Sequence, residues 1–378
     1  MSFSSVAARA ARILSLALFV VVGANLTSSG SSGGNDSFLP PGPPTDAPPG
    51  DLVVYAAMGR GNRIDAYRLG SDGLLPSLPF DTIFVENPRR LAVANGVLYA
   101  TLFDRVIGMR LAADGSLPSV ATSSTADRFD YDPVDLVVRD NILYVAAAEL
   151  SLVQSFELDE DGDLPLVATG AGQSQYLGDF LSLAFDGDTP YLYAGARDTE
   201  YIDVFLLEPD GNVPFAAEPQ NPQDDISLPD DIEIRDHILY VTSASDRSIR
   251  AYRILPNGFL PGTYDSRTDS EEYYSDILLD GDTLYAAAYN AGRIDLYTMD
   301  PDGMLPKLGP FYTTGGDPAS YPSKMVMNDG ILYVAQAGLN RVDAYVLGAD
   351  GLPTAYPTSS TASIDDSLPL DIVLHQLN

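Results

Sequence analysis

Cysteine is absent from this chain of 378 residues, and histidine is nearly so, with only His237 and His375. The lack of cysteine excludes a disulfide framework, a thiolate nucleophile and any metal site built on thiolates. The two histidines both fall at the far end of a predicted inner strand, away from the acidic loops described below. No GxSxG, HExxH or phosphate-loop pattern is present either. These absences argue against Ser–His catalysis and against a histidine-bound metal.

Basic residues are also scarce, at 21 against 53 acidic residues, for a formal net charge of −32. A chain without a basic patch cannot displace the counterions of a nucleic acid, so nucleic acid is excluded as a partner. Anionic membrane surfaces are disfavoured for the same reason. The acidity has two explanations, solubility or attraction of cations and basic partners, and we favour solubility.

Long apolar runs are missing except near the N-terminus. Arg9 and Arg12 precede an apolar stretch at 13–24, and Val22 and Ala24 lie where a signal peptidase reads small residues. This stretch is shorter than the roughly 20 residues that span a bilayer. Residues 1–24 are therefore predicted to be a cleaved signal peptide, with an uncleaved anchor as the alternative. The sequence therefore predicts an exported protein, periplasmic or extracellular, that has no transmembrane span once the signal peptide is removed.

Residues 25–50 are rich in glycine and serine and then in proline. This composition is typical of a linker that is flexible and then semi-extended. We expect the folded domain to begin after it.

The chain contains a sequence motif that is repeated seven times. Each copy is a strand of alternating polar and apolar residues followed by an Asp-Gly or Asn-Gly turn. Examples are NRIDAYRLGSDGLLP at 62–76 and GRIDLYTMDPDGMLP at 292–306. A period of this size, made of short β segments, is typical of propeller blades. The turn glycines recur every 42 to 49 residues: Gly73, Gly115, Gly162, Gly211, Gly258, Gly303 and Gly351.

Each repeat predicts four short antiparallel strands, because its apolar runs are separated by turn residues. The sequence therefore predicts an all-β, seven-bladed β-propeller over residues 51–378, forming one domain and expected to be a monomer. The first repeat starts directly with its second strand, and residues 370–378 match the inner strand that it lacks. We expect this C-terminal strand to complete the first blade and close the ring, which removes exposed sheet edges.

The short Asp-Gly turns all belong to one rim of this propeller, and longer loops rich in Asp, Glu and Tyr belong to the other. Variable loops on a rigid scaffold are the usual place for binding. The sequence therefore predicts a binding face at the second rim. These loops are 129–133, 196–201, 224–231, 243–248, 269–276 and 364–369.

Charged residues gather at one position of the repeat, where each inner strand begins beside the predicted central channel. Two alternatives give this ring a function: a Ca²⁺ ion held by Asp231 and Asp276, or paired carboxylates acting in hydrolysis. The third alternative is a water-filled channel whose charges partly cancel. The aligned residues are Arg90, Asp135, Ser182, Asp231, Asp276, Lys324 and Asp371.

A second carboxylate recurs on the third strand, two residues before a recurring aromatic of the repeat. We interpret these aspartates as hydrogen-bond acceptors between blades, and the aromatics as core residues. The aspartates are Asp65, Asp203, Asp295 and Asp343, and the aromatics are Tyr67, Phe205, Tyr297 and Tyr345.

The recurring core DGxLYVA, seen as DGILYVA at 329–335 and in DGDTLYAAA at 280–288, resembles the seven-bladed lactonase-like propellers. That family includes enzymes similar to 6-phosphogluconolactonase and muconate cycloisomerase, as well as YVTN-type surface propellers. The resemblance covers 51–378 and implies the fold and a lactonase activity. The cycloisomerase pattern of histidine with arginine and glutamate finds no match here.

Two functional hypotheses follow. The first is an exported binding scaffold that holds a small molecule or an envelope or extracellular protein through its acidic, Tyr-bearing loops. The alternative is a lactonase-like hydrolase that opens a carbohydrate lactone. In it, Asp231 and Asp276 would supply carboxylates, and Arg90 or Lys324 would stabilise the developing oxyanion. The sequence favours the scaffold, and it indicates no cofactor apart from the Ca²⁺ ion considered above.

Overall fold

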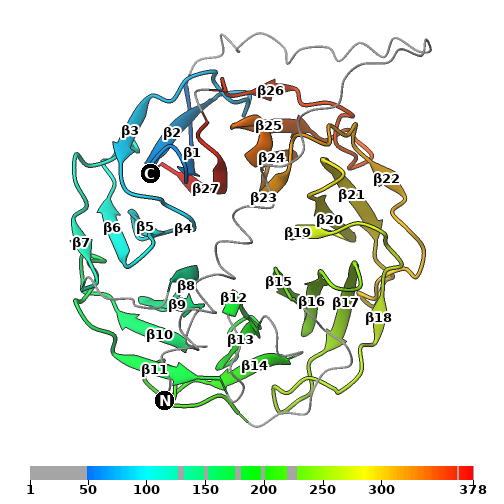
Figure 1. The fold of residues 1–378 in the computed structure, drawn as a ribbon, viewed down its shortest axis with the longest axis horizontal. Helices are drawn as coiled ribbons and strands as arrows, with labels where there is room; N and C mark the ends of the chain where they lie inside the picture. The colour runs from blue at the N-terminus through cyan, green and yellow to red at the C-terminus, as the bar shows by residue number, and fades with distance from the viewer. Residues whose placement is uncertain are drawn as a thin grey trace, which may run out of the picture. The chain divides into compact units, whose positions relative to one another are not determined.

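The computed structural model describes residues 49–126, 132–148, 152–174, 180–196, 201–218, 228–363 and 366–377. The predicted signal peptide at 1–24 and nearly all of the predicted linker at 25–50 lie outside these residues. Within them, seven antiparallel sheets are arranged radially around a common centre (Figure 1). The seven-bladed propeller predicted from the repeat is confirmed.

Each blade is one sheet, and blades are numbered here in chain order from the sheet that holds β1. The inner strands are β27 (Pro369–Gln376), β4 (Leu91–Ala94), β8 (Pro133–Arg139), β12 (Phe180–Phe185), β15 (Ile232–Arg235), β19 (Tyr274–Asp280) and β23 (Pro322–Asn328). The second strands are β1 (Pro49–Met58), β5 (Val97–Thr101), β9 (Ile142–Ala147), β13 (Tyr191–Ala196), β16 (Ile238–Ser243), β20 (Thr283–Ala288) and β24 (Ile331–Gln336).

The outer half of each blade carries the alternating strand of the repeat and, beyond it, a short edge strand. The third strands are β2 (Arg63–Gly70), β6 (Val106–Arg110), β10 (Leu152–Glu157), β14 (Tyr201–Leu206), β17 (Ser248–Arg253), β21 (Arg293–Thr298) and β25 (Arg341–Val346). The edge strands are β3 (Asp81–Phe84), β7 (Ser123–Ser124), β11 (Gly170–Gln173), β18 (Ser266–Arg267), β22 (Tyr312–Thr313) and β26 (Ser359–Ser360). A single 3-10 turn, η1 (Ala337–Leu339), interrupts the all-β character of the described residues.

Ring closure occurs as predicted. Strand β27 pairs antiparallel with β1, from Leu52 opposite Gln376 to Ala57 opposite Asp371. Strand β27 also contacts the inner strands on both sides, β23 and β4, and the other inner strands contact their neighbours in turn. The C-terminal strand is therefore built into blade 1 and completes the circle (Figure 1).

Blade 4 departs from the expected four strands, since its sheet is β12-β13-β14 in the described residues. The segment expected to form its edge begins to pair with β14, since the Glu218 N–H donates to the Val204 carbonyl at 2.8 Å. It also bonds to blade 3: the Gln173 N–H donates to the Phe215 carbonyl at 3.0 Å, and the Ala217 N–H donates to the Gln173 carbonyl at 3.1 Å. Glycine permits this approach, because a Cβ at Gly172 would lie 2.4 Å from the Pro214 carbonyl oxygen.

The hydrophobic core is divided into seven clusters, each lying between two consecutive blades. The cluster between blades 1 and 2, for example, contains Tyr55, Ile64, Leu98 and Ile107. The same arrangement recurs around the ring to the cluster of blades 7 and 1. Every blade thus buries both faces against its neighbours and none could bury them alone.

Candidate functional site

The aligned ring residues come together at the centre of the molecule. A cavity of about 310 Å³ lies among the inner strands and is lined by residues from all of them except β19. Asp276, on β19, is almost fully buried, with 1% of its surface exposed, and its carboxylate contacts Lys324. The ring residues that line the cavity are Arg90, Asp135, Ser182, Asp231, Lys324 and Asp371.

A second cavity of about 270 Å³ shares Arg90 and lies on the loop-bearing side. Its lining consists mainly of residues that directly precede ring residues, such as Arg89, Asp230 and Ser323. Tyr273 also lines it, and the Tyr273 and Tyr289 rings meet edge to face at 5.8 Å between centroids. This second cavity lies at the predicted binding rim, of which loops 243–248 and 269–276 are fully described. The loops 129–133, 196–201, 224–231 and 364–369 lie partly outside the described residues.

Most ring residues have a structural role that the sequence did not reveal. Their side chains accept a hydrogen bond from a backbone N–H of the next inner strand. A polar acceptor is needed there, because a buried N–H without a partner is costly. The acceptors and donors are Asp371 and Leu91 (2.7 Å), Asp135 and Leu183 (2.7 Å), Ser182 and Ile232 (3.2 Å), Asp231 and Ile277 (2.9 Å), and Asp276 and Met325 (2.8 Å).

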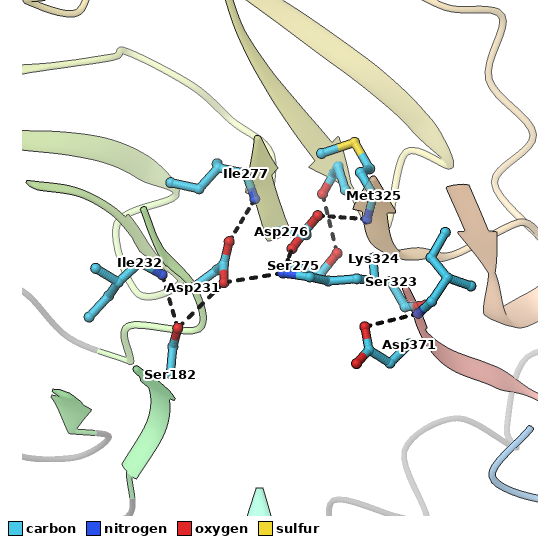
Figure 2. A network of polar contacts seen from close by, with 12 residues as sticks. Ser182, Asp231, Ile232, Ser275, Asp276, Ile277, Ser323, Lys324, Met325 and Asp371 are labelled. Atoms are coloured by element: carbon cyan, nitrogen blue, oxygen red, sulfur yellow. Dashed lines mark hydrogen bonds and ion pairs between the residues drawn. The ribbon is translucent and has the colours of Figure 1, made fainter. Parts of the chain in front are cut away.

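The ammonium group of Lys324 is held by two of these carboxylates (Figure 2). Its Nζ lies 2.5 Å from Asp276 Oδ1 and 3.7 Å from Asp231 Oδ1. Burial alone would lower the pKa of Lys324, but the carboxylates of Asp231 and Asp276 outweigh it and hold this pKa well above its usual range. Its side chain is still 27% exposed. The ring therefore presents a permanently charged, oriented ammonium to the cavity.

Calcium does not fit the place that the sequence suggested for it. The Lys324 ammonium lies where the Asp231 and Asp276 carboxylates converge, and each of these carboxylates also accepts a backbone N–H. A cation site needs several oxygen ligands around one vacant point. No cluster of three or more His, Cys, Asp or Glu side chains suited to a metal ion occurs within the described residues.

Burial makes several carboxylates of the ring weaker acids than usual, including Asp276, whose pKa is raised. Burial raises the pKa of Asp135 to about 6, even though Arg90 lowers it. Burial likewise raises the pKa of Asp371 above its usual range, again against the influence of Arg90. For Arg90, burial would lower the pKa, and the surrounding carboxylates, Asp371 first, raise it. Perturbed groups gathered in a cavity are typical of functional sites, as well as of buried ion-pair networks.

Glu233 is a cavity residue that the sequence patterns considered above did not single out. It lies on β15, two residues after Asp231, and lines the same 310 Å³ cavity. Burial, followed by the nearby Asp231 carboxylate, raises the pKa of Glu233 to about 7. The aligned repeats contain a signal that distinguishes Glu233. Two residues after the ring position the other inner strands carry only aliphatic residues: Ala92, Val137, Ala184, Leu278, Val326 and Val373.

The recurrent aspartates of the third strands do not join neighbouring blades in general, which corrects our interpretation. Asp65 accepts hydrogen bonds from Arg63 and Thr82 of its own blade. Asp295 and Asp343 likewise bond to arginines of their own strands. Only Asp203 of the four bonds to a neighbouring blade among the described residues, through Ser174. The carboxylates that recur in this joining role are those of the ring, whose inner strands lie side by side.

The histidines lie apart from the ring residues. His237 Nδ1 is 2.8 Å from Asp186 Oδ2, and its side chain is 69% exposed. His375 lies near the end of β27, where its ring is 6.4 Å from that of Tyr55.

Within the described residues, no helix has the length and apolar character to cross a membrane.

No family model matches this chain, and no curated protein matches it. Solved structures do resemble it. A candidate 6-phosphogluconolactonase from Bacteroides uniformis has a TM-score of 0.72 at 18% identity, covering 86% of this chain and 100% of that one. Its counterpart from Bacteroides fragilis has a TM-score of 0.70 at 19% identity, covering 86% and 98%.

A periplasmic gluconolactonase from Pseudomonas aeruginosa has a TM-score of 0.67 at 17% identity, covering 86% of this chain and 100% of that one. Identities of this size carry the fold and not the activity. The chain has the fold of the seven-bladed lactonase-like propellers.

Proposed function

We propose that this protein hydrolyses a small sugar lactone in the central cavity. The single observation that carries the proposal is the Lys324 ammonium, which is charged, partly exposed and oriented by Asp276 and Asp231. The structural neighbours named as gluconolactonases support the same reaction class. These comparisons favour the lactonase alternative over the binding scaffold that the sequence favoured. No observation on the described residues favours the scaffold specifically.

In this proposal Lys324 and Arg90 stabilise negative charge on the lactone carbonyl oxygen as water adds to the carbonyl carbon. Fixed cations are effective at this, because they need no reorganisation as the charge develops. Asp231 and Asp276 act as positioning residues, since they hold the ammonium in place and bond to the next blades.

The substrate that suits this cavity is an uncharged sugar lactone. The ring carries four carboxylates, Asp135, Asp231, Asp276 and Asp371, against the two cations Arg90 and Lys324. Such a balance disfavours a phosphorylated sugar, whose added negative charge meets several carboxylates. A neutral polyol lactone can instead use the carboxylates as hydrogen-bond acceptors.

We also propose that the protein acts outside the cytoplasm, as a monomer. The signal-peptide pattern at 1–24 supports export, and one structural neighbour is described as periplasmic. Export would also separate the protein from cytosolic sugar phosphates, in agreement with an uncharged substrate.

The test is hydrolysis of glucono-1,5-lactone by the purified protein, followed by proton release and corrected for the spontaneous rate. We expect turnover, with kcat/KM reduced by a factor on the order of 10²–10³ in Lys324→Met, because an oxyanion-stabilising group is lost. Lys324→Arg, which keeps the charge, should lose less.

Lys307→Met is the matched control, since Lys307 is exposed and is the only other lysine of the chain. It should leave the rate unchanged. Melting curves establish that each variant is folded, because removing one partner of a buried ion pair is destabilising. Hydrolysis no faster than the spontaneous reaction, across several uncharged aldonolactones, would refute the proposed function.

A further inference from the structure

The cavity has a polar ring at its mouth and an apolar belt behind it. Strand side chains alternate in direction, so the residue two positions after each ring residue points the same way. At this second level, Val137, Ala184, Val326 and Val373 line the cavity together with Glu233. Glu233 is thus a lone carboxylate among aliphatic side chains.

Glu233 also differs from the ring carboxylates in its bonding. Asp135, Asp231, Asp276 and Asp371 each accept a backbone N–H from the neighbouring blade. No hydrogen bond or ion pair occupies the Glu233 carboxylate within the described part of the chain. An oxygen already committed to a backbone N–H is a poor proton acceptor, because protonation would break that bond. Among these five carboxylates, Glu233 alone has no hydrogen-bond or ion-pair partner on either oxygen in the described residues, whereas Asp135 keeps only Oδ1 without one.

Resting on the proposed lactone hydrolysis, we infer that Glu233 is the catalytic general base, a role that the sequence suggested for Asp231 or Asp276. Glu233 removes a proton from a water molecule as the water oxygen bonds to the lactone carbonyl carbon. The carbonyl oxygen becomes an oxyanion facing Lys324. When the intermediate collapses, the bond between the carbonyl carbon and the ring oxygen breaks, and the protonated Glu233 returns its proton to that oxygen. The product is the open hydroxy acid.

The electrostatic setting of Glu233 suits this role. Burial and Asp231 raise the pKa of Glu233 to about 7, while Lys324 and Arg235 lower it. A base is most effective when its pKa lies near the working pH. The charged groups around it are Asp231 just before its own strand, Arg235 on that strand, Lys324 on β23, Asp276 on β19, Arg90 before β4, Asp135 on β8 and Asp371 on β27.

The experiment is the pH dependence of kcat/KM for glucono-1,5-lactone, measured with the wild-type protein and with Glu233→Gln. The wild type should lose activity below about pH 7, as Glu233 becomes protonated. Glu233→Gln should lose a factor on the order of 10²–10⁴ and lose this acidic limb, because glutamine cannot accept the proton. Glu233→Asp should keep the limb at a reduced rate, and it serves as the second variant if Glu233→Gln does not fold.

Glu157→Gln is the matched control, since Glu157 is exposed at the end of β10, and it should not change the pH profile.

The outcomes separate the proposed lactonase function from the proposed role of Glu233. A wild type without turnover refutes the lactonase function itself. A wild type with turnover, together with a Glu233→Gln variant that keeps its rate within threefold and its acidic limb, refutes the role of Glu233 alone. If Asp135→Asn removes the limb while Glu233→Gln keeps it, the base is Asp135.

Discussion

Seven tyrosines of the DGxLYVA motif show how single residues hold the propeller together. Each donates its hydroxyl to the carbonyl oxygen of the turn glycine in the next blade, at distances from 2.6 to 3.1 Å. The pairs run around the complete ring, ending with Tyr333 and Gly73. A buried hydroxyl needs such a partner, so tyrosine and turn recur together. The most regular part of the repeat therefore encodes assembly of the blades.

Glu233 affects stability as well as the proposed chemistry. Its pKa rises from an ordinary value of 4.5 to about 7 in the folded protein. Below pH 4.5 Glu233 is neutral in both the folded and the unfolded state, so its burial does not lower the free energy of unfolding. Between pH 4.5 and 7 only the unfolded chain releases the proton, so the free energy of unfolding falls as the pH rises.

We therefore predict that Glu233→Gln stabilises the protein at pH 8 and does so much less at pH 5. The difference between the two pH values should be on the order of 2 kcal/mol, after allowance for partial exposure. Urea unfolding of wild type and variant at both pH values measures it. An equal effect of the substitution at pH 5 and pH 8 would show that the carboxylate titrates normally.

At the scale of elements, the turn after the third strand requires glycine for two reasons. Gly162 has φ of +80°, and a Cβ there would lie 2.9 Å from Val97 Cγ2 and 3.1 Å from the Tyr99 hydroxyl. Gly96, in a first turn, has φ of +74°, but a Cβ there would have no neighbouring atom within 4 Å. Of these two turns, only the third-strand turn combines a positive φ with close contact to the neighbouring blade.

This difference predicts unequal effects of alanine. Gly96→Ala should cost about 1 kcal/mol, which is the backbone penalty alone. Gly162→Ala should cost roughly 2–4 kcal/mol, because the contact with buried Val97 adds to the same penalty. Thermal unfolding of both variants measures the costs. Equal losses would mean that the third-strand turn can shift away from the neighbouring blade.

At the scale of the whole molecule, stability depends on closing the ring. Strand β27 supplies the inner strand of blade 1, the Asp371 bond to Leu91 and contacts with β23. Without it, β1 has an open edge and blades 1, 2 and 7 lose buried surface. The formal net charge of −32 causes repulsion among the acidic residues, and this repulsion destabilises an opened ring more than a closed one.

We predict that deletion of residues 370–378 sharply lowers the melting temperature. Because the end of β27 lies beside the start of β1, with Gln376 opposite Leu52, the same nine residues placed before residue 51 should restore it. Circular dichroism on heating compares the three chains. An unchanged melting curve after the deletion would contradict the closure argument, and failure of the moved strand to rescue would show that its C-terminal connection matters.

Sequence alone determined the architecture and the membership of the ring. The period of the turn glycines specifies the blades, and strand alternation specifies which side chains face the centre. These are local properties, repeated seven times, so they survive without knowledge of any partner. The same alignment contained Glu233, which stands out once the second inward-facing level is compared across the repeats.

Tertiary structure alone decided what the ring residues do. Whether Asp231 meets a cation, a backbone N–H or water depends on β19 and β23, which belong to the next two blades. The structure brings Ile277 and Lys324 to that carboxylate and leaves Glu233 without a hydrogen-bond partner among the described residues. Bonding partners and pKa values depend on burial and on distances between blades, and these are set only when all seven blades have packed against one another.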